Sequence, residues 1–122
     1  MALTSPSSNP VAEIRHRKRL EKIERLQEEA NVLVGLHPGT GLWLFGSLAR
    51  GDWDAYSDVD VLAVAPSQGE ADQLADAVLS TGLADDALAL SAEEWAQRRC
   101  SDDPYWRAIG RDAICLTGPN WS

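Results

Sequence analysis

The sequence lacks any long apolar run, since no stretch approaches the roughly 18 apolar residues that a membrane-spanning helix needs. Residues 1–9 also lack the charged start, apolar centre and cleavage site of a signal peptide. Cysteine is scarce, with two in 122 residues, so we expect reduced, packed thiols at Cys100 and Cys115 rather than a disulfide framework. These absences predict a cytoplasmic protein without a membrane segment.

Basic residues are scarce beyond the N-terminal part of the chain. Up to Arg25 there are six Lys and Arg against three acids, whereas the rest has five against sixteen, for a net charge of −8. A long nucleic acid needs a basic stripe to displace counterions from its phosphates, so we do not expect nucleic acid as a stable direct ligand. The basic cluster from Arg15 to Arg25 is either a solvated helix face paired with interleaved glutamates or a contact for RNA, a phosphate or an acidic partner.

With 44% hydrophobic and 25% charged residues, the composition is that of an ordinary globular domain with one core. We expect a flexible tail over residues 1–9, one domain over 10–118, and a C-terminal tail over 119–122. The domain would consist of an N-terminal helix at 10–34 and a catalytic core at 42–118. Whether it forms a homo-oligomer is left open.

Segments whose apolar residues recur with helical periodicity alternate along the chain with short apolar segments typical of strands. Asn9-Pro10 is typical of a helix start, and Ser67 and Ser91, each with Glu three residues later, are capping boxes that open two further helices. The apolar stripe of the first helix is assigned to Ile14, Leu20, Ile23, Leu26, Ala30 and Leu33. Strands are expected over 42–45, 58–65, 83–90 and 113–117. This order predicts an α/β (α+β) fold with a small mixed sheet of about four strands covered by helices.

The turn after the first strand carries Gly46 and Ser47. A glycine there lets the backbone turn tightly and approach a ligand, and a serine opening the next helix adds a hydroxyl to the N–H groups at its positive end. The pair alone describes an ordinary helix cap as well as a phosphate site. Arg50 either contacts a triphosphate or pairs with a loop acid such as Asp52 or Asp54.

Two acids, Asp58 and Asp60, open the second predicted strand. Being two residues apart on a strand, they would point to the same face and share a divalent cation. Without a cation their repulsion and desolvation would raise a pKa or destabilise the strand, so bound Mg²⁺ is the economical explanation. The alternative is that Asp58 is solvated and Asp60 alone is half-buried. A triphosphate held by the preceding turn would place its α-phosphate beside these acids.

Residues 46–62 resemble the signature of the DNA polymerase beta-like nucleotidyltransferase superfamily, in particular its minimal, antitoxin-type (MNT-type) members. The matching residues are Gly46-Ser47-x-Ala49-Arg50-Gly51-Asp52 and Ser57-Asp58-Val59-Asp60-Val61-Leu62. The resemblance implies a polymerase beta palm-like fold, with Gly46 and Ser47 on the β- and γ-phosphates of ATP as substrate. It also implies two Mg²⁺ ions bound by Asp58 and Asp60.

The resemblance further implies a third carboxylate at the start of a neighbouring strand, for which Asp86 is the candidate. It would accept the proton of the attacking hydroxyl or complete the site of the catalytic metal. Asp85 is its rival. The two point to opposite faces, and Asp86 shares its face with Leu88 and Leu90, so a one-residue shift in register reverses the choice. The alternative is that both acids are solvated turn residues.

The function implied by the resemblance is transfer of AMP from ATP to a hydroxyl of a protein partner. Minimal members are often antitoxins that adenylylate a tyrosine of a HEPN-type ribonuclease toxin. The alternatives are a non-catalytic module that blocks its partner by contact, and a small-molecule (antibiotic) nucleotidyltransferase. Large aromatic residues usually serve burial in a core or interface, and among the tryptophans a ligand contact is an alternative only for Trp53, in the loop beside the site.

Overall fold

A computed structural model describes residues 10–52 and 58–117. The two predicted tails, together with Trp53, Asp54 and Ser57, lie outside these residues. The elements are α1 (Pro10–Gly35), β1 (Gly41–Phe45), α2 (Ser47–Arg50), β2 (Asp60–Ala65), α3 (Gln68–Thr81), β3 (Asp86–Ser91), α4 (Ala92–Arg99), α5 (Pro104–Asp112) and β4 (Ile114–Cys115). The predicted fold class, a small mixed sheet of four strands covered by helices, is confirmed.

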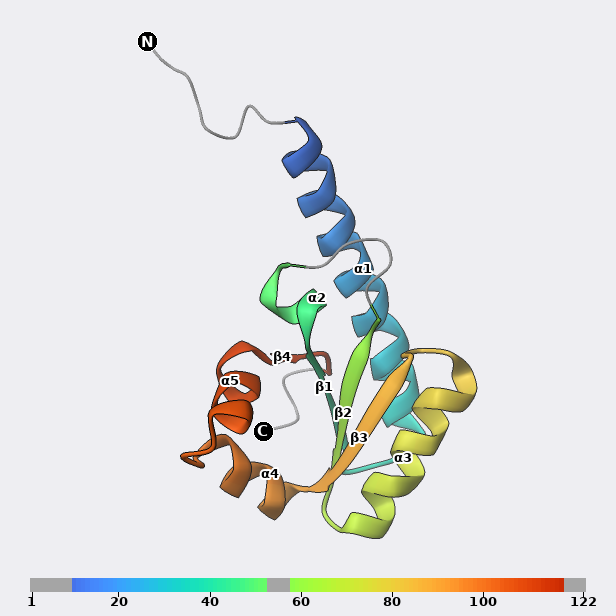
Figure 1. Cartoon of the computed structure of the whole chain (residues 1–122). Coiled ribbons are helices and arrows are strands. Elements are labelled where there is room, and N and C mark those ends of the chain that lie inside the picture. The colour runs from blue at the N-terminus through green and yellow to red at the C-terminus, as the bar shows by residue number, and fades with distance from the viewer. Residues whose placement is uncertain (1–9, 53–57, 118–122) are drawn as a thin grey trace.

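The four strands lie in the order β3-β2-β1-β4 (Figure 1). β1 runs antiparallel to both β2 and β4, whereas β2 and β3 are parallel. Phe45, the last residue of β1, lies opposite Asp60, the first residue of β2, and Asp60 is in register with Asp86 of β3. The end of β1 and the starts of β2 and β3 therefore meet at one edge of the sheet.

Helices cover both faces of the sheet, α1 and α3 on one side and α4 and α5 on the other (Figure 1). Alternate residues of β2 enter the two cores. Val61 and Ala63 pack with α1 and α3, whereas Leu62 and Val64 pack with Trp95 on the other side. Asp60 has the parity of Leu62 and therefore belongs to the face that α4 and α5 cover.

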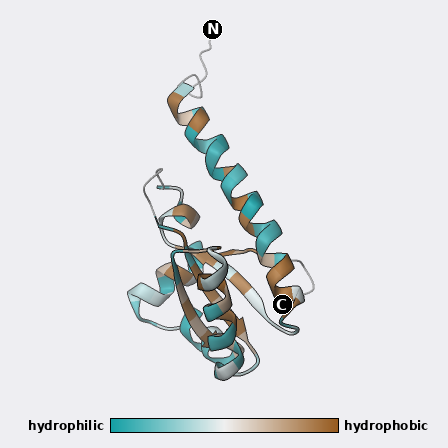
Figure 2. Cartoon of the chain, turned by 90° about the vertical axis from the view of Figure 1, so that its right-hand side faces the viewer, coloured by the Kyte–Doolittle hydropathy of each residue, from teal (hydrophilic) through white to brown (hydrophobic). Residues whose placement is uncertain are grey.

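The C-terminal half of α1 is the part that packs against the body. Ile23, Leu26, Ala30 and Leu33 are buried as predicted. The prediction was wrong for Ile14 and Leu20, which are 48% and 49% exposed. The periodicity continues there, but the N-terminal half of the helix projects beyond the sheet (Figures 1 and 2), so these two apolar side chains are not covered by the core. None of the described helices is long and apolar enough to cross a membrane.

Both predicted capping boxes are present: Ser67 accepts a hydrogen bond from the Glu70 N–H, and Ser91 accepts one from the Glu94 N–H.

Two strands begin later than predicted, because β2 begins at Asp60 rather than at residue 58 and β3 begins at Asp86 rather than at residue 83. Cys100 and Cys115 are free thiols, but Cys100 is exposed rather than packed.

Candidate functional site

A cleft of about 570 Å³ lies at the sheet edge where β1 ends and β2 begins, a volume typical of small-molecule sites. Its lining residues are Phe45, Gly46, Ser47, Arg50, Asp58, Asp60, Tyr105, Ala108, Ile109 and Asp112. The structure thus brings five of the six predicted site residues to one cleft. The sixth, Asp86, does not line it.

Gly46 directly follows β1 and has a positive φ of 82° with ψ of −159°, a backbone conformation that favours glycine over residues with a side chain. A Cβ atom at this position would lie 2.5 Å from Oδ2 of Asp60, much closer than van der Waals contact. Glycine therefore satisfies two requirements, the turn and the approach of a carboxylate. Gly46 is also the N-cap residue of α2, so α2 has no side-chain cap and Ser47 is its first helical residue.

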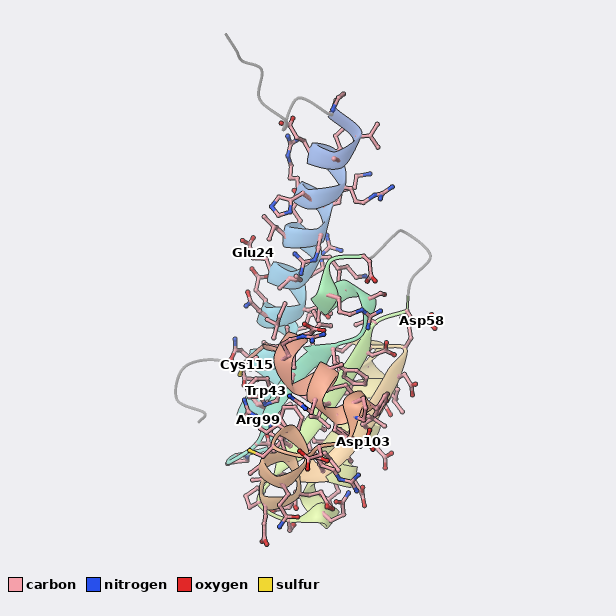
Figure 3. The ribbon with its side chains drawn as sticks, turned by 60° about the vertical axis from the view of Figure 1, so that its left-hand side comes forward. Glu24, Trp43, Asp58, Arg99, Asp103 and Cys115 are labelled. Atoms are coloured by element: carbon pink, nitrogen blue, oxygen red, sulfur yellow. The ribbon has the colours of Figure 1, made fainter. Side chains whose placement is uncertain are left out.

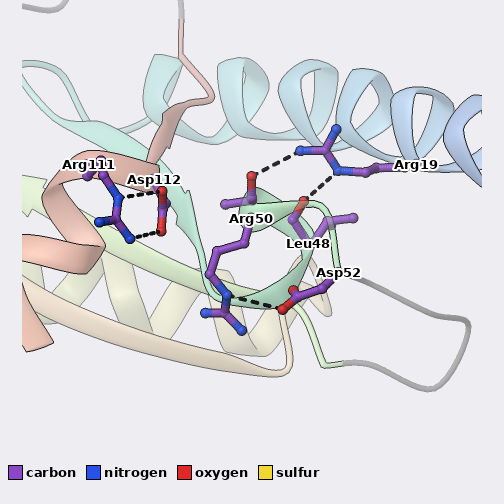
Figure 4. Close-up of polar contacts among 7 residues, drawn as sticks. Arg19, Leu48, Arg50, Asp52, Arg111 and Asp112 are labelled. Carbon is purple, nitrogen blue, oxygen red and sulfur yellow. Dashed lines mark hydrogen bonds and ion pairs between the residues drawn. The ribbon is translucent and has the colours of Figure 1, made fainter.

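Arg19 of α1 holds the other end of α2. Its Nε donates to the Leu48 carbonyl at 2.8 Å and its Nη2 donates to the Ala49 carbonyl at 3.0 Å (Figure 4). A helix of four residues is not stable by itself, so these bonds help to fix the turn that carries Ser47. One member of the basic cluster thus has a structural role that neither sequence interpretation anticipated.

Among the acids that line the cleft, Asp60 is the one whose pKa is raised. Its pKa is raised above the ordinary value, first by burial and then by the negative charges of Asp86, Asp58 and Asp85, while Arg50 opposes the shift. Burial disfavours the ionised carboxylate, and the neighbouring acids add to this effect. Asp60 is therefore the acid whose ionised form a bound cation would stabilise most.

Asp58 lies two residues before β2 begins and is exposed, where the chain enters that strand (Figure 3). The expectation that both acids lie on a strand was therefore wrong. Asp58 nevertheless lines the same cleft as Asp60. The two reach one site because an extended segment leads directly into the strand.

Asp85 and Asp86 have different surroundings. Oδ2 of Asp85 accepts a hydrogen bond of 2.8 Å from the Val59 N–H, so this carboxylate helps to join the start of β2 to the segment before β3. Asp86 is in register with Asp60 on a parallel strand, so the two side chains share a face. Oδ1 of Asp86 accepts a bond of 3.1 Å from the Ala87 N–H. The geometry favours Asp86 over Asp85 as third carboxylate, and its role stays a prediction.

No group of three or more His, Cys, Asp or Glu side chains in residues 10–52 and 58–117 is gathered closely enough to hold a metal ion. Asp58 and Asp60 fit a looser arrangement, because Mg²⁺ usually keeps several waters and takes one or two carboxylates plus substrate phosphates. The raised pKa of Asp60 supports this fit. Asp86 would have to turn from the Ala87 N–H to take part.

Arg50 pairs with a loop acid, which is one of the two roles considered for it, and its contact with a triphosphate stays a prediction. Its Nε lies 3.5 Å from Oδ2 of Asp52 (Figure 4), and its side chain lines the cleft. The ion pair is about half exposed and long, so it contributes little stability. A more strongly charged ligand in the cleft would compete easily for this guanidinium.

Sequence reasoning missed the wall that α5 provides. Tyr105, Ala108, Ile109 and Asp112 recur at helical spacing and share one face of α5, and all four line the cleft. The Arg111 guanidinium, hydrogen-bonded to Asp112 at 3.1 Å, lowers the pKa of that carboxyl group (Figure 4). The spacing was readable in the sequence, but only the packing of α5 across the sheet shows that this face meets the predicted site.

The model of the family described as nucleotidyltransferase domain matches residues 23–100. No curated protein and no solved structure matches the chain significantly. The match spans more than half of the 122 residues and includes the Gly46-Ser47 turn, Asp58, Asp60 and Asp86, whereas α5 follows it. The chain therefore belongs to the nucleotidyltransferase domain family.

Proposed function

We propose that this protein transfers a nucleoside monophosphate, AMP from ATP, to a hydroxyl group of a protein partner. One observation carries the proposal: within the segment that matches the family, the Gly46-Ser47 turn lies directly against the Asp60 carboxylate in one cleft. A phosphate-holding turn and a cation-holding acid in contact are what a metal–triphosphate complex requires.

The reaction forms a bond between the acceptor oxygen and the α-phosphorus of ATP and breaks the bond from that phosphorus to the bridging oxygen, so pyrophosphate leaves. Gly46 and Ser47 would hold the β- and γ-phosphates, and Arg50 would contact them from the end of α2. Asp86 would accept the proton of the attacking hydroxyl. A carboxylate base positioned in this way contributes roughly 10²–10⁴-fold to such a rate.

Asp58 and Asp60 would hold Mg²⁺; if Asp86 instead completed the metal site, it would do so in place of its role as proton acceptor. When bound, the metal neutralises charge that develops on the transferred phosphate and on the leaving group. The side chains themselves supply position and negative charge. Arg50 opposes the raised pKa of Asp60, so it keeps that carboxylate closer to the ionised form that a cation requires.

The partner we propose is a HEPN-type ribonuclease toxin, which would be neutralised when one of its tyrosines is adenylylated. This assignment rests on the resemblance of residues 46–62 to minimal, antitoxin-type members. We expect the reaction to occur in the cytoplasm, where ATP and Mg²⁺ are abundant.

A label-transfer experiment tests the proposal. The purified chain is incubated with Mg²⁺, ATP labelled at the α-phosphate and the protein encoded by the neighbouring gene, and the label on that protein is measured. We expect labelling by the wild type and by Asp76→Ala, which removes an exposed acid of α3, but not by Asp58→Ala/Asp60→Ala. Equal labelling by the double variant would contradict the proposed site.

One observation favours the second candidate, a non-catalytic binding module: within the described segments, no three acidic side chains are gathered tightly enough for one ion. The two candidates separate when inhibition of the partner is measured beside label transfer. Inhibition that survives in the double variant, without any label, would establish the binding module.

A further inference from the structure

The cleft has two chemically different parts. The β1–α2–β2 region supplies Ser47, Arg50, Asp58 and Asp60, whose side chains are polar or charged, together with Gly46 and the apolar Phe45, whereas most of the α5 contribution is apolar. Among the large exposed hydrophobic side chains of the described segments, Tyr105 is the one that lines the cleft, and it is 57% exposed. A fixed aromatic ring exposed in a cleft offers a stacking surface.

The backbone of Tyr105 is fixed before any ligand binds, and one edge of its ring has a neighbour. The backbone N–H of Tyr105 donates to Oδ1 of Asp103 at 2.9 Å, which caps α5. The ring meets that of Trp106 edge to face, at 83° with centroids 5.3 Å apart. The Arg98 guanidinium lies 5.1 Å from the centre of the Trp106 ring. The exposed part of the Tyr105 ring is free to receive a flat ligand, and the contact with Trp106 reduces the conformational freedom lost on stacking.

The whole of α5 is anchored to the sheet through α4. A Cβ atom at Gly110 would lie 3.0 Å from the Cβ of Arg99, so the two helices are in close contact. Arg99 in turn covers the rings of Trp43 and Trp95, at 5.0 and 4.9 Å from their centres (Figure 3). The position of Tyr105 in the cleft is therefore set by packing rather than by a loop.

We propose that α5 forms the nucleobase wall of this cleft and that Tyr105 stacks on the base, an inference that rests on the proposed function. A nucleoside triphosphate has a charged, metal-binding end and one flat, weakly polar end. The polar part of the cleft suits the first, and the face of α5 formed by Tyr105, Ala108 and Ile109 suits the second. Since stacking accepts any base, Tyr105 supplies affinity, with purines favoured by their larger rings.

Two ligands that differ in the base test this assignment by titration calorimetry with Mg²⁺: α,β-methylene-ATP, which resists the transfer reaction, and inorganic tripolyphosphate, which has no base. We expect Tyr105→Ala to weaken the nucleotide by about 10- to 100-fold, the effect of losing one stacked ring, and to leave tripolyphosphate unchanged. Tyr105→Phe keeps the ring and should bind both as the wild type does.

A control variant is Leu36→Ala, which removes a 74% exposed side chain at the end of α1 and should change neither affinity. Equal weakening of both ligands by Tyr105→Ala would overturn the nucleobase wall, because the substitution would then act through the phosphate end. Unchanged affinity for both would overturn it as well and would leave the proposed function standing. If the wild type bound neither ligand, the proposed function itself would fail together with the wall.

Discussion

Gly46 and Asp60 are in such close contact that any side chain on residue 46 would force the Asp60 carboxylate to move. A Cβ atom on residue 46 would lie 2.5 Å from Oδ2 of Asp60, because Gly46 directly follows the last residue of β1, Phe45, which lies opposite Asp60 at the start of β2. The turn expected to hold phosphates and the acid expected to hold a metal are thus one structural unit. Changes at either residue should affect both stability and ligand binding.

Gly46→Ala should destabilise the fold and abolish Mg²⁺-dependent nucleotide binding. With φ of 82° and ψ of −159°, Gly46 is in a backbone region that is essentially restricted to glycine, so an alanine there costs on the order of 1–3 kcal/mol, and the clash with Asp60 adds to that cost. Gly82→Ala, at φ of 78° and ψ of 14°, is a control for alanine in the ordinary left-handed region, where a Cβ atom would meet no described atom within 4 Å. Urea unfolding of Gly46→Ala in the wild type and in an Asp60→Ala background isolates the clash, and equal losses of unfolding free energy in the two backgrounds would show that Asp60 does not constrain Gly46.

Asp60→Asn should raise the melting temperature of the metal-free protein. Since the pKa of Asp60 is raised in the folded state, the folded chain binds protons more tightly than the unfolded chain. Its ionisation therefore costs stability as the pH rises above the ordinary carboxyl value of 3.8. At neutral pH we expect a gain of about a few degrees, which disappears in acid below that value.

The same variant should lose the response to metal. Mg²⁺ with α,β-methylene-ATP should raise the melting temperature of the wild type, because a ligand that binds only the folded state stabilises it, and should leave Asp60→Asn unchanged. Asp76→Asn provides the control. A metal-free melting temperature lower than that of the wild type would contradict the electrostatic account of Asp60.

Substitution of Asp85 should lower stability, whereas substitution of Asp86 should lower the rate of transfer. Asp85→Ala removes the acceptor of the Val59 N–H bond, so we expect a loss of about 1–2 kcal/mol of unfolding free energy. Asp86→Ala should fold normally and lose roughly 100-fold or more in transfer rate. Urea unfolding measures the free energy of unfolding of both variants, and the label-transfer experiment measures their transfer rates. The reverse pattern would assign the third carboxylate to Asp85.

Arg19→Ala should destabilise the protein by about 1–2 kcal/mol, because two charged hydrogen bonds to α2 are lost. Arg19→Lys should restore only part of the lost unfolding free energy, since a lysine cannot donate two hydrogen bonds with the fixed geometry of a guanidinium. Arg17→Ala, in the exposed part of the same cluster, should be nearly neutral. Urea unfolding measures all three, and an equal effect of Arg17→Ala would show that Arg19 has no special role.

Local signals in the sequence were reliable predictors of this fold. Ser67 and Ser91 were identified as helix caps because a cap involves residues only three positions apart, and both bonds are present. The parity of Asp86 with Leu88 and Leu90 was also readable, since alternation along a strand is a property of the backbone. Asp86 does lie in register with Asp60.

Features that depend on tertiary packing could not be predicted. The periodicity of α1 includes Ile14 and Leu20, but that part of the helix projects beyond the sheet, so both are exposed. In the sequence, the spacing of Tyr105, Ala108 and Ile109 is the same as that of residues on the core face of any helix. Its place in the cleft follows from the contact between Gly110 and Arg99, which joins two helices whose approach no local pattern specifies.

The central claim is that the α-phosphate, and not the γ-phosphate, moves from the nucleotide to the acceptor. The direct measurement compares ATP labelled at the α-phosphate with ATP labelled at the γ-phosphate, each incubated with Mg²⁺, the protein and its partner. We predict that the α-label becomes covalently attached to the partner while the γ-label is released in pyrophosphate. Attachment of the γ-label, or of neither label, would contradict nucleotidyl transfer by this cleft.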